Sequence, residues 1–205
     1  MMNKLSLRRI KREATAHALA QAAFELTLQH GLDGFVVEDV AQRAGYSRRT
    51  FANHYSCKEE AVAMAAVPFH GIEEAVAIFN NIPESSTPLD VMYQFMKLQL
   101  TEEIIQKMLR LVTLSKEHPT LEPYMLTVFH RLATEAQQVL NDLFKEHYPA
   151  IYSHVLTGAV TGAIFPLFDG TLQVVLPGQS MDEVPGAESF DQYLDTVFGY
   201  LRNGL

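Results

Sequence analysis

Apolar residues recur at helical spacing along almost the whole chain, and no segment shows the alternation with period two that marks a half-buried strand. From Ile10 to His30 the apolar positions describe one amphipathic helix, which Gly31 closes. Further helices are predicted from Cys57 to about residue 79 and over residues 88–100, 102–117, 121–147, 149–176 and 190–202. Pro166 and Gly170 are expected to kink the helix over residues 149–176. With the two short helices described next, the sequence predicts an all-α protein of about nine helices.

Two short helices separated by a glycine occupy the stretch from Val37 to Lys58. Gly45 stands where the chain turns between them, and glycine enters the left-handed region without steric cost. Ser47 is the expected N-cap of the second helix, with its hydroxyl accepting from a backbone N–H two or three residues later. This layout is typical of a helix-turn-helix.

The outward side chains of the second short helix are basic or polar and can meet base edges and phosphates. They are Arg48, Arg49, Thr50, Asn53 and His54. Phe51 and Tyr55, four residues apart, would anchor that helix to the core. A helix, a glycine and a second helix also occur in proteins that never touch DNA, so the pattern by itself leaves both interpretations open.

Charge is distributed unevenly between the two ends of the chain. Residues 1–58 hold nine Lys and Arg against five Asp and Glu, a net charge of +4, whereas the remainder holds seven against 19, a net charge of −12. A polyanion would attract the basic end and repel the acidic one, and lysine and arginine release counterions where they meet phosphate. The charge pattern therefore favours DNA binding by the N-terminal quarter.

The length of 205 residues allows one domain or two, and a hydrophobic content of 48% is ordinary for a soluble globular protein. No apolar run is expected to approach the ~20 residues that span a membrane, and the charged start of the chain has no apolar core behind it. The lone cysteine, Cys57, excludes an internal disulfide framework. We therefore expect a cytoplasmic protein with no membrane partner.

The N-terminal region resembles the tetracycline-repressor (TetR) family of bacterial transcriptional regulators over roughly residues 10–62. The residues that carry the resemblance are Gly31, Val37, Val40, Ala41, Ala44, Gly45, Ser47, Thr50, His54, Tyr55 and Lys58. The resemblance implies a three-helix DNA-binding domain, which we expect over residues 1–57, and a helical effector-binding and dimerisation domain over residues 58–205. It also implies a repressor that binds a palindromic operator in double-stranded DNA as a homodimer and is released by a small-molecule effector.

By the same resemblance, one set of residues is expected to contact DNA bases or phosphates. The set is Arg12, Thr15, Ser47, Arg48, Arg49, Thr50, Asn53, His54, Tyr55 and Lys58. The chain departs from the family pattern at three positions, where Val36 replaces a Thr or Ser cap, Ala52 replaces an aromatic residue, and Arg49 replaces a glycine or proline. The first two changes remove customary contacts with the DNA backbone, for which Arg49 can compensate.

A two-fold dimer is expected because one recognition helix reads only a few base pairs. The last two helices are the candidate interface, with Gly158 and Gly162 in a stripe of small residues and Phe198 and Leu201 as bulky surfaces. Packing inside one subunit is the alternative explanation of these four residues.

The middle helices are rich in adaptable and aromatic residues that would suit an apolar or aromatic small molecule. The predicted lining is Met92, Phe95, Met96, Gln99, Met108, Leu111, Met125, Phe129, His130, Phe165 and Phe168. The candidate polar groups that would orient the ligand are Tyr93, Gln99, Tyr124 and His130. Ordinary core packing is the alternative for each of these residues taken singly.

Other chemistries find no support in the sequence. The histidines are scattered without metal-ligand spacing, and no catalytic or phosphate-cradling motif is present, so we expect no metal, no cofactor and no enzymatic activity. Cys57 at a helix start could act as a redox switch, or it could simply fill the usual serine position. The alternative to a regulator is a helical small-molecule carrier or protein-interaction module without specific DNA binding.

Overall fold

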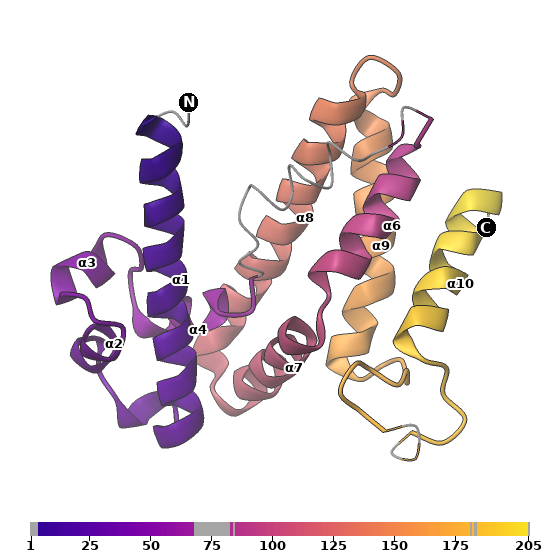
Figure 1. Cartoon of the computed structure of the whole chain (residues 1–205). Helices are drawn as coiled ribbons and strands as arrows, with labels where there is room; N and C mark the ends of the chain where they lie inside the picture. The colour runs from indigo at the N-terminus through magenta and orange to yellow at the C-terminus, as the bar shows by residue number, and fades with distance from the viewer. Residues whose placement is uncertain (1–3, 68–82, 84, 181, 183, 205) are drawn as a thin grey trace. The chain divides into compact units, whose positions relative to one another are not determined.

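The computed structural model describes residues 4–67, 83, 85–180, 182 and 184–204. Within these residues it contains nine α-helices, two 3-10 turns, and an isolated bridge between Val175 and Ser189 in place of any strand. The elements, shown in Figure 1, are α1 (Lys4–His30), η1 (Leu32–Gly34), α2 (Val37–Arg43), α3 (Arg48–Ala52), α4 (Lys58–Met64), α6 (Pro88–Gln99), α7 (Glu102–Glu117), η2 (Pro119–Leu121), α8 (Glu122–Phe144), α9 (Ala150–Asp169) and α10 (Phe190–Asn203). The all-α prediction is confirmed. The helix predicted from Cys57 to about residue 79 ends at Met64, and residues 65–67 are not helical. The rest of that prediction, from residue 68 on, lies outside the described residues.

The chain divides into two compact units. One consists of residues 1–71 with 113–128, and the other of residues 72–112 with 129–205. The unit that contains the helix-turn-helix therefore also includes the end of α7, η2 and the start of α8. The functional boundary expected after residue 57 remains a prediction, since a compact unit is defined by packing and not by role.

In the N-terminal unit, α1 is the central helix and packs against α2 and α4. Leu19 and Ala23 lie on its buried face at 0% exposure. The helix ends where Gly31 adopts a φ of 73°, which the absence of a Cβ allows, and its N–H bonds the Thr27 carbonyl at 2.9 Å. The chain then reverses into η1 and α2.

Polar contacts hold α1 to its neighbours in this unit. The Arg43 guanidinium of α2 donates from Nε and Nη2 to Glu25 of α1 at 2.9 and 2.8 Å, and from Nη1 to Gln29 at 3.1 Å. At the start of α4, Cys57 is the N-cap and its sulfur accepts from the Glu60 N–H. The thiol beside the Tyr124 hydroxyl raises the pKa of this tyrosine, which lies at the start of α8.

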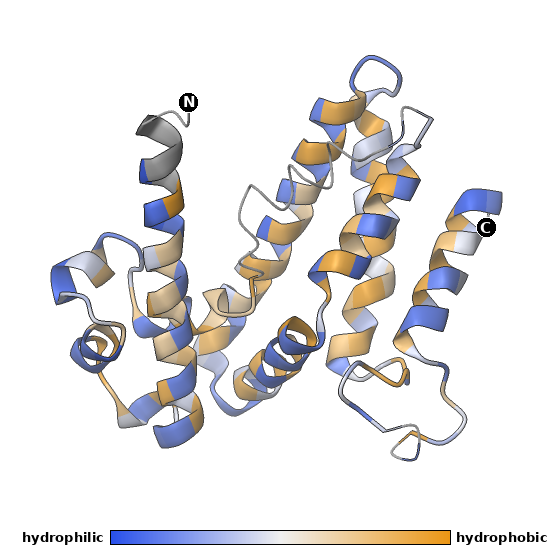
Figure 2. Cartoon of the chain, in the orientation of Figure 1, coloured by the Kyte–Doolittle hydropathy of each residue, from blue (hydrophilic) through white to orange (hydrophobic). Residues whose placement is uncertain are grey.

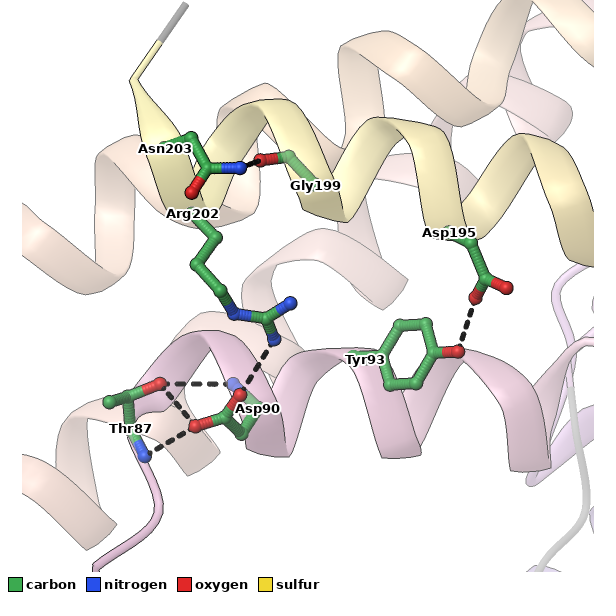
Figure 3. A network of polar contacts seen from close by, with 7 residues as sticks. All are labelled: Thr87, Asp90, Tyr93, Asp195, Gly199, Arg202 and Asn203. Carbon is green, nitrogen blue, oxygen red and sulfur yellow. Dashed lines mark hydrogen bonds and ion pairs between the residues drawn. The ribbon is translucent and has the colours of Figure 1, made fainter.

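In the C-terminal unit, α6 packs against α10. The contact combines a ring pair with a network of polar contacts, and Figure 3 shows the polar network. Tyr93 and Phe198 meet edge to face with ring centroids 5.1 Å apart. Arg202 donates to Asp90 at 2.8 Å, and the Tyr93 hydroxyl donates to Asp195. These contacts join the first two turns of α6 to α10, from the second turn of α10 to its last.

The helix α9 is 20 residues long, and by length and composition it could cross a membrane, with a mean hydropathy of 1.4 over 18 residues. The expectation that no apolar run reaches this length was therefore wrong, because small and hydroxylated residues keep the run uncharged up to Asp169. One such helix is weak evidence of a membrane span, since a core helix of a soluble protein has the same composition. Figure 2 shows α9 largely in white and orange.

The prediction for the end of α9 was also wrong. Gly170 does not kink the helix but ends it, as a left-handed C-cap with a φ of 84°. Residues 171–176 are not helical, and Val174, Val175 and Leu176 are nevertheless buried. These three residues contribute to the core as a loop segment, so an apolar run alone does not distinguish this loop from a continued helix.

Candidate nucleic-acid interface

The turn between α2 and α3 has the geometry that the sequence predicted. Gly45 has a φ of 75°, and a Cβ built there would meet no atom within 4 Å, so the backbone conformation and not space requires glycine. Ser47 is the N-cap of α3 and accepts from the Thr50 N–H at 3.0 Å. A glycine and one hydroxyl therefore fix the direction in which the five-residue α3 leaves the turn.

The first turn of α3 presents basic side chains to solvent. Arg48 is 75% exposed, and its Nη1 lies 2.8 Å from Oε1 of Glu38 on α2. Arg49 is exposed and has no hydrogen-bond or ion-pair partner among the described residues. Thr50 is half-buried, with its hydroxyl 2.9 Å from that of Ser47. Asn53, the C-cap of α3, is exposed.

The side of α3 that faces α1 brings together further predicted residues. His54 is half-buried, and its burial, with the nearby Arg12 guanidinium, lowers its pKa. Thr15 on α1 donates to the Lys11 carbonyl at 2.9 Å and lies 3.5 Å from the Tyr46 hydroxyl. Arg12, Thr15 and His54 thus belong to one region of the N-terminal unit, with Arg12 the most accessible of the three.

Two of the residues expected to contact DNA are used inside the protein. Tyr55 is 7% exposed, and its hydroxyl donates to the Ala16 carbonyl at 2.8 Å, so the predicted anchoring role holds while a DNA contact by this side chain is not supported. The Lys58 ammonium donates to the carbonyls of Leu32 and Phe35 at 2.7 and 3.0 Å and lies 5.0 Å from the centroid of the Phe35 ring. Lys58 joins α4 to the loop after α1 instead of standing open to an anion.

Sequence reasoning missed two residues of this surface. Glu38 is one of the five acidic residues within residues 1–58. A net charge does not show which charges are neighbours, so the ion pair of Glu38 with Arg48 could not be predicted from it. Tyr46, which is 38% exposed, lies between the turn glycine and the helix cap, where a bulky side chain has no packing role in the periodic pattern. The position of Val36 was anticipated, because it is the N-cap of α2 without a side-chain bond, and its N–H donates to Asp39 at 2.9 Å.

The predicted effector-binding residues include a ring cluster and part of the lining of one small hollow. Phe129 meets Phe165 and Phe168 with ring centroids 5.0 and 6.1 Å apart, which brings three of them together between α8 and α9. A hollow of about 10 Å³ between α6 and α8 is lined by Val91, Met92, Phe95, Ala136, Val139 and Leu140. That volume is about what one water needs.

The other predicted effector-binding residues differ in how far they are buried. Gln99, Met108 and Leu111 are buried, Met96 is half-buried and His130 is exposed. Met125 belongs to the N-terminal unit, where its sulfur accepts from Ser115 at 3.4 Å. Sequence reasoning missed the Thr157 hydroxyl on α9, which is buried without a hydrogen-bond partner in the described part of the chain. A single threonine inside an apolar helix does not reveal from the sequence whether its hydroxyl has a partner.

The predicted interface residues separate into two groups. Gly158 and Gly162 on α9 are exposed, in line with Ile151 and Val155, which are 63% and 60% exposed. Leu201 is half-buried, but Phe198 is 1% exposed against Tyr93 within the same chain. Core packing, the alternative considered for Phe198, is therefore its role. The described residues include no group of three or more His, Cys, Asp or Glu side chains that could hold a metal ion.

Comparison with known proteins adds three findings. Residues 19–63 match the family described as bacterial regulatory proteins, tetR family. The HTH-type transcriptional regulator TcmR of Streptomyces glaucescens is 34% identical over 91 residues, which are 44% of this chain and 39% of TcmR. This chain thus aligns with about two fifths of the length of that curated relative. The crystal structure of a proposed TetR-family transcriptional regulator from Mesorhizobium loti MAFF303099 covers 94% of this chain and 95% of its own, at 12% identity and a TM-score of 0.49.

Proposed function

Because the chain belongs to the TetR family of bacterial regulatory proteins through its residues 19–63, we propose that it is a DNA-binding transcriptional regulator. The observation that carries the proposal is the short helix α3, which Ser47 caps and which has exposed Arg48 and Arg49 in its first turn and exposed Asn53 as its C-cap. Arginine bonds guanine and asparagine bonds adenine with paired hydrogen bonds in the major groove. The N-terminal residues of a recognition helix are those that reach base edges.

The proposed target is a palindromic operator bound by a homodimer. A helix of five residues contacts only a few base pairs, so two copies are needed for a site that is rare in a genome. The exposed and uncharged face of α9, with Val155, Gly158 and Gly162, supports that helix as the interface. Small residues allow two such helices to approach closely.

The proposed regulation is release of the operator when a small apolar or aromatic molecule binds the C-terminal unit. The ring cluster of Phe129, Phe165 and Phe168 and the unpartnered hydroxyl of Thr157 support an aromatic ligand with one polar group. The hollow beside Met92 and Phe95 is too small for such a molecule, so binding would have to displace side chains. Methionine adapts readily to such displacement.

Members of this family are generally non-enzymatic DNA-binding proteins. We infer a regulator without enzymatic activity that acts in the cytoplasm, where its DNA target is found, and that represses the genes beside its operator. Repression is the mode we propose because a bound dimer excludes other proteins from the same duplex.

The test is a selection experiment followed by affinity measurements at graded salt. The full chain would be used to enrich duplexes of about 30 base pairs from a randomised library, and the double variant Arg49→Ala/Asn53→Ala would then be compared with wild type on the enriched duplex. We expect the double variant to lose at least about tenfold in affinity, as base contacts are worth about 1–3 kcal/mol each. Arg110→Ala, which removes an exposed arginine of α7, is the matched control and should change affinity little.

Two outcomes would contradict the proposal. Equal affinity and salt dependence for wild type and the double variant would show that α3 does not read the duplex. No enriched sequence, together with binding of small aromatic molecules, would instead indicate the helical carrier or interaction module.

A further inference from the structure

The contact between Glu38 and Arg48 joins the two helices of the helix-turn-helix through their exposed side chains. Arg48 is the first residue of α3, and Glu38 is in the first turn of α2. The 2.8 Å ion pair lies in solvent, with the two side chains 75% and 50% exposed. Such an exposed pair adds little to folding stability, so its effect on what Arg48 can contact is the more informative question.

The geometry of the pair leaves part of the guanidinium free. Glu38 accepts from Nη1 of Arg48, and no other described residue takes its Nε or Nη2 donors. These two donors form the parallel fork that matches a pair of acceptors on one guanine edge. A carboxylate on the far side of the guanidinium thus limits its orientation while the recognising edge remains open.

The charge of Glu38 acts in the same direction. An arginine at the start of α3 without a partner can swing onto any phosphate of the backbone, and such contacts carry no sequence information. With Glu38 held at 2.8 Å, the pair is close to neutral and gains less from a phosphate. The Glu38 carboxylate is also itself repelled by the duplex.

We propose that Glu38 is a specificity-determining positioning residue, which holds Arg48 for base contact and lowers affinity for duplexes without the preferred base. This inference rests on the proposed DNA-binding function. Glu38 touches no base in this mechanism and acts through Arg48. The neighbouring Arg49 is exposed and has no such partner among the described residues, so no carboxylate limits its orientation in the same way.

The test compares Glu38→Gln with wild type on two probes, the duplex enriched by the full-length wild-type chain and the same duplex with its sequence scrambled. We expect Glu38→Gln to raise affinity for the scrambled duplex about three- to fivefold, in line with the loss of a surface ion pair and of one repelling charge. The ratio of the two affinities should fall about fivefold or more, because discrimination by an arginine–guanine pair requires the paired hydrogen bonds that a fixed guanidinium makes. The salt slope on the scrambled duplex should steepen by about one.

Two controls separate positioning from a change in net charge or in folding. Asp33→Asn removes one exposed acid of the same unit away from α3 and should leave the affinity ratio unchanged. In an Arg48→Ala background, Glu38→Gln should cause no further loss of discrimination, because the residue through which it acts is gone. Both charge variants remove exposed groups, so melting curves close to that of wild type are expected.

The outcomes are distinct. An unchanged affinity ratio in Glu38→Gln, or the same loss of discrimination with and without Arg48, would overturn the inference while the DNA-binding function stands. Failure of the wild-type chain to enrich any duplex would overturn the proposed function and this inference with it.

Discussion

The hydroxyl of Tyr55 donates to the backbone carbonyl of Ala16 at 2.8 Å, across 39 residues of sequence. This bond ties the segment after α3 to the middle of α1. Replacing Tyr55 with Phe keeps the ring, which packs 5.7 Å from that of Phe51, and removes only the bond. We expect a loss of about 1 kcal/mol in the free energy of unfolding, measured by urea denaturation.

Tyr46→Phe is the matched control for that experiment. The Tyr46 hydroxyl is 3.5 Å from Thr15 and the residue is 38% exposed, so its loss should cost less than about 0.5 kcal/mol. Equal costs for the two variants would mean that the Tyr55 bond does not stabilise the unit.

Lys58→Met should lower the free energy of unfolding and leave the salt dependence of DNA affinity unchanged. The ammonium bonds two carbonyls, so its removal should cost about 2 kcal/mol, a typical value for charged hydrogen bonds of a half-buried group. The salt slope of DNA affinity should stay that of wild type at a temperature where both chains are folded. A slope reduced by about one would show instead that Lys58 contacts a phosphate.

The pH dependence of DNA binding should report on His54. Burial and Arg12 lower its pKa, so the imidazole is neutral in the free protein at neutral pH, and a nearby phosphate would favour the charged form. DNA binding then takes up a proton, and affinity should rise as the pH falls towards and below the ordinary value of about 6.5. His54→Gln should flatten that rise, whereas His30→Gln, at the exposed end of α1, should not.

The lowered pKa of His54 affects folding stability in the opposite direction: stability should fall as the pH falls, whereas DNA affinity should rise. Because the folded chain favours neutral His54, its contribution is present above the ordinary pKa and is lost as the pH falls through the lowered one. A melting temperature of the free chain that rose on acidification in wild type but not in His54→Gln would contradict the direction of the shift.

Thr87→Ala tests the start of α6. The Thr87 hydroxyl accepts from the Asp90 N–H at 3.2 Å and donates to the Asp90 carboxylate at 2.7 Å (Figure 3), and loss of such a cap costs about 1 kcal/mol. The Thr87 donors, followed by Arg202, lower the pKa of Asp90, so its contribution to stability is lost as the pH falls through that lowered pKa. The variant should therefore lose less stability on acidification. Thr196→Ala, exposed on α10, is the control and should change the unfolding free energy by less than about 0.5 kcal/mol.

Val155→Glu tests the proposed role of α9. Val155 is 60% exposed on the uncharged face of that helix, and a carboxylate there would have to lose its water if two copies met. Sedimentation analysis should find a monomer for the variant and a dimer for wild type. Leu172→Glu introduces the same group at a residue that is 44% exposed beyond the end of α9, and should leave the dimer intact.

The sequence was most informative where local chemistry decides the structure. Gly45 and Ser47 act on residues within one turn of themselves, so both the turn and the cap of α3 could be predicted. The roles of Tyr55 and Lys58 depend on carbonyls of Ala16, Leu32 and Phe35, which lie 23 to 39 residues away, and no spacing rule brings such groups together. A resemblance could identify these positions, but not the groups that their side chains meet.

In the C-terminal unit, apolar periodicity likewise could not predict which groups the side chains contact. Phe198 and Leu201 lie on one face of α10 and looked equivalent in the apolar pattern, yet Phe198 is enclosed by Tyr93 and Leu201 is half-buried. Periodicity identifies the apolar face of a helix, but not whether that face meets its own chain or another. The pairing of Glu38 with Arg48 could not be predicted for a related reason, because a count of charges does not show which charges are neighbours.

The contacts of Arg43 with Glu25, Tyr55 with Ala16, and Lys58 with the loop after α1 have a joint consequence. Each ties a different element, α2, the segment after α3, or α4, back to α1 or its end, so these elements cannot tilt independently without breaking a bond. The N-terminal unit should respond to any signal as a rigid body. In the proposed dimer, a ligand that releases DNA would change the distance between the two N-terminal units. It would not unfold either unit.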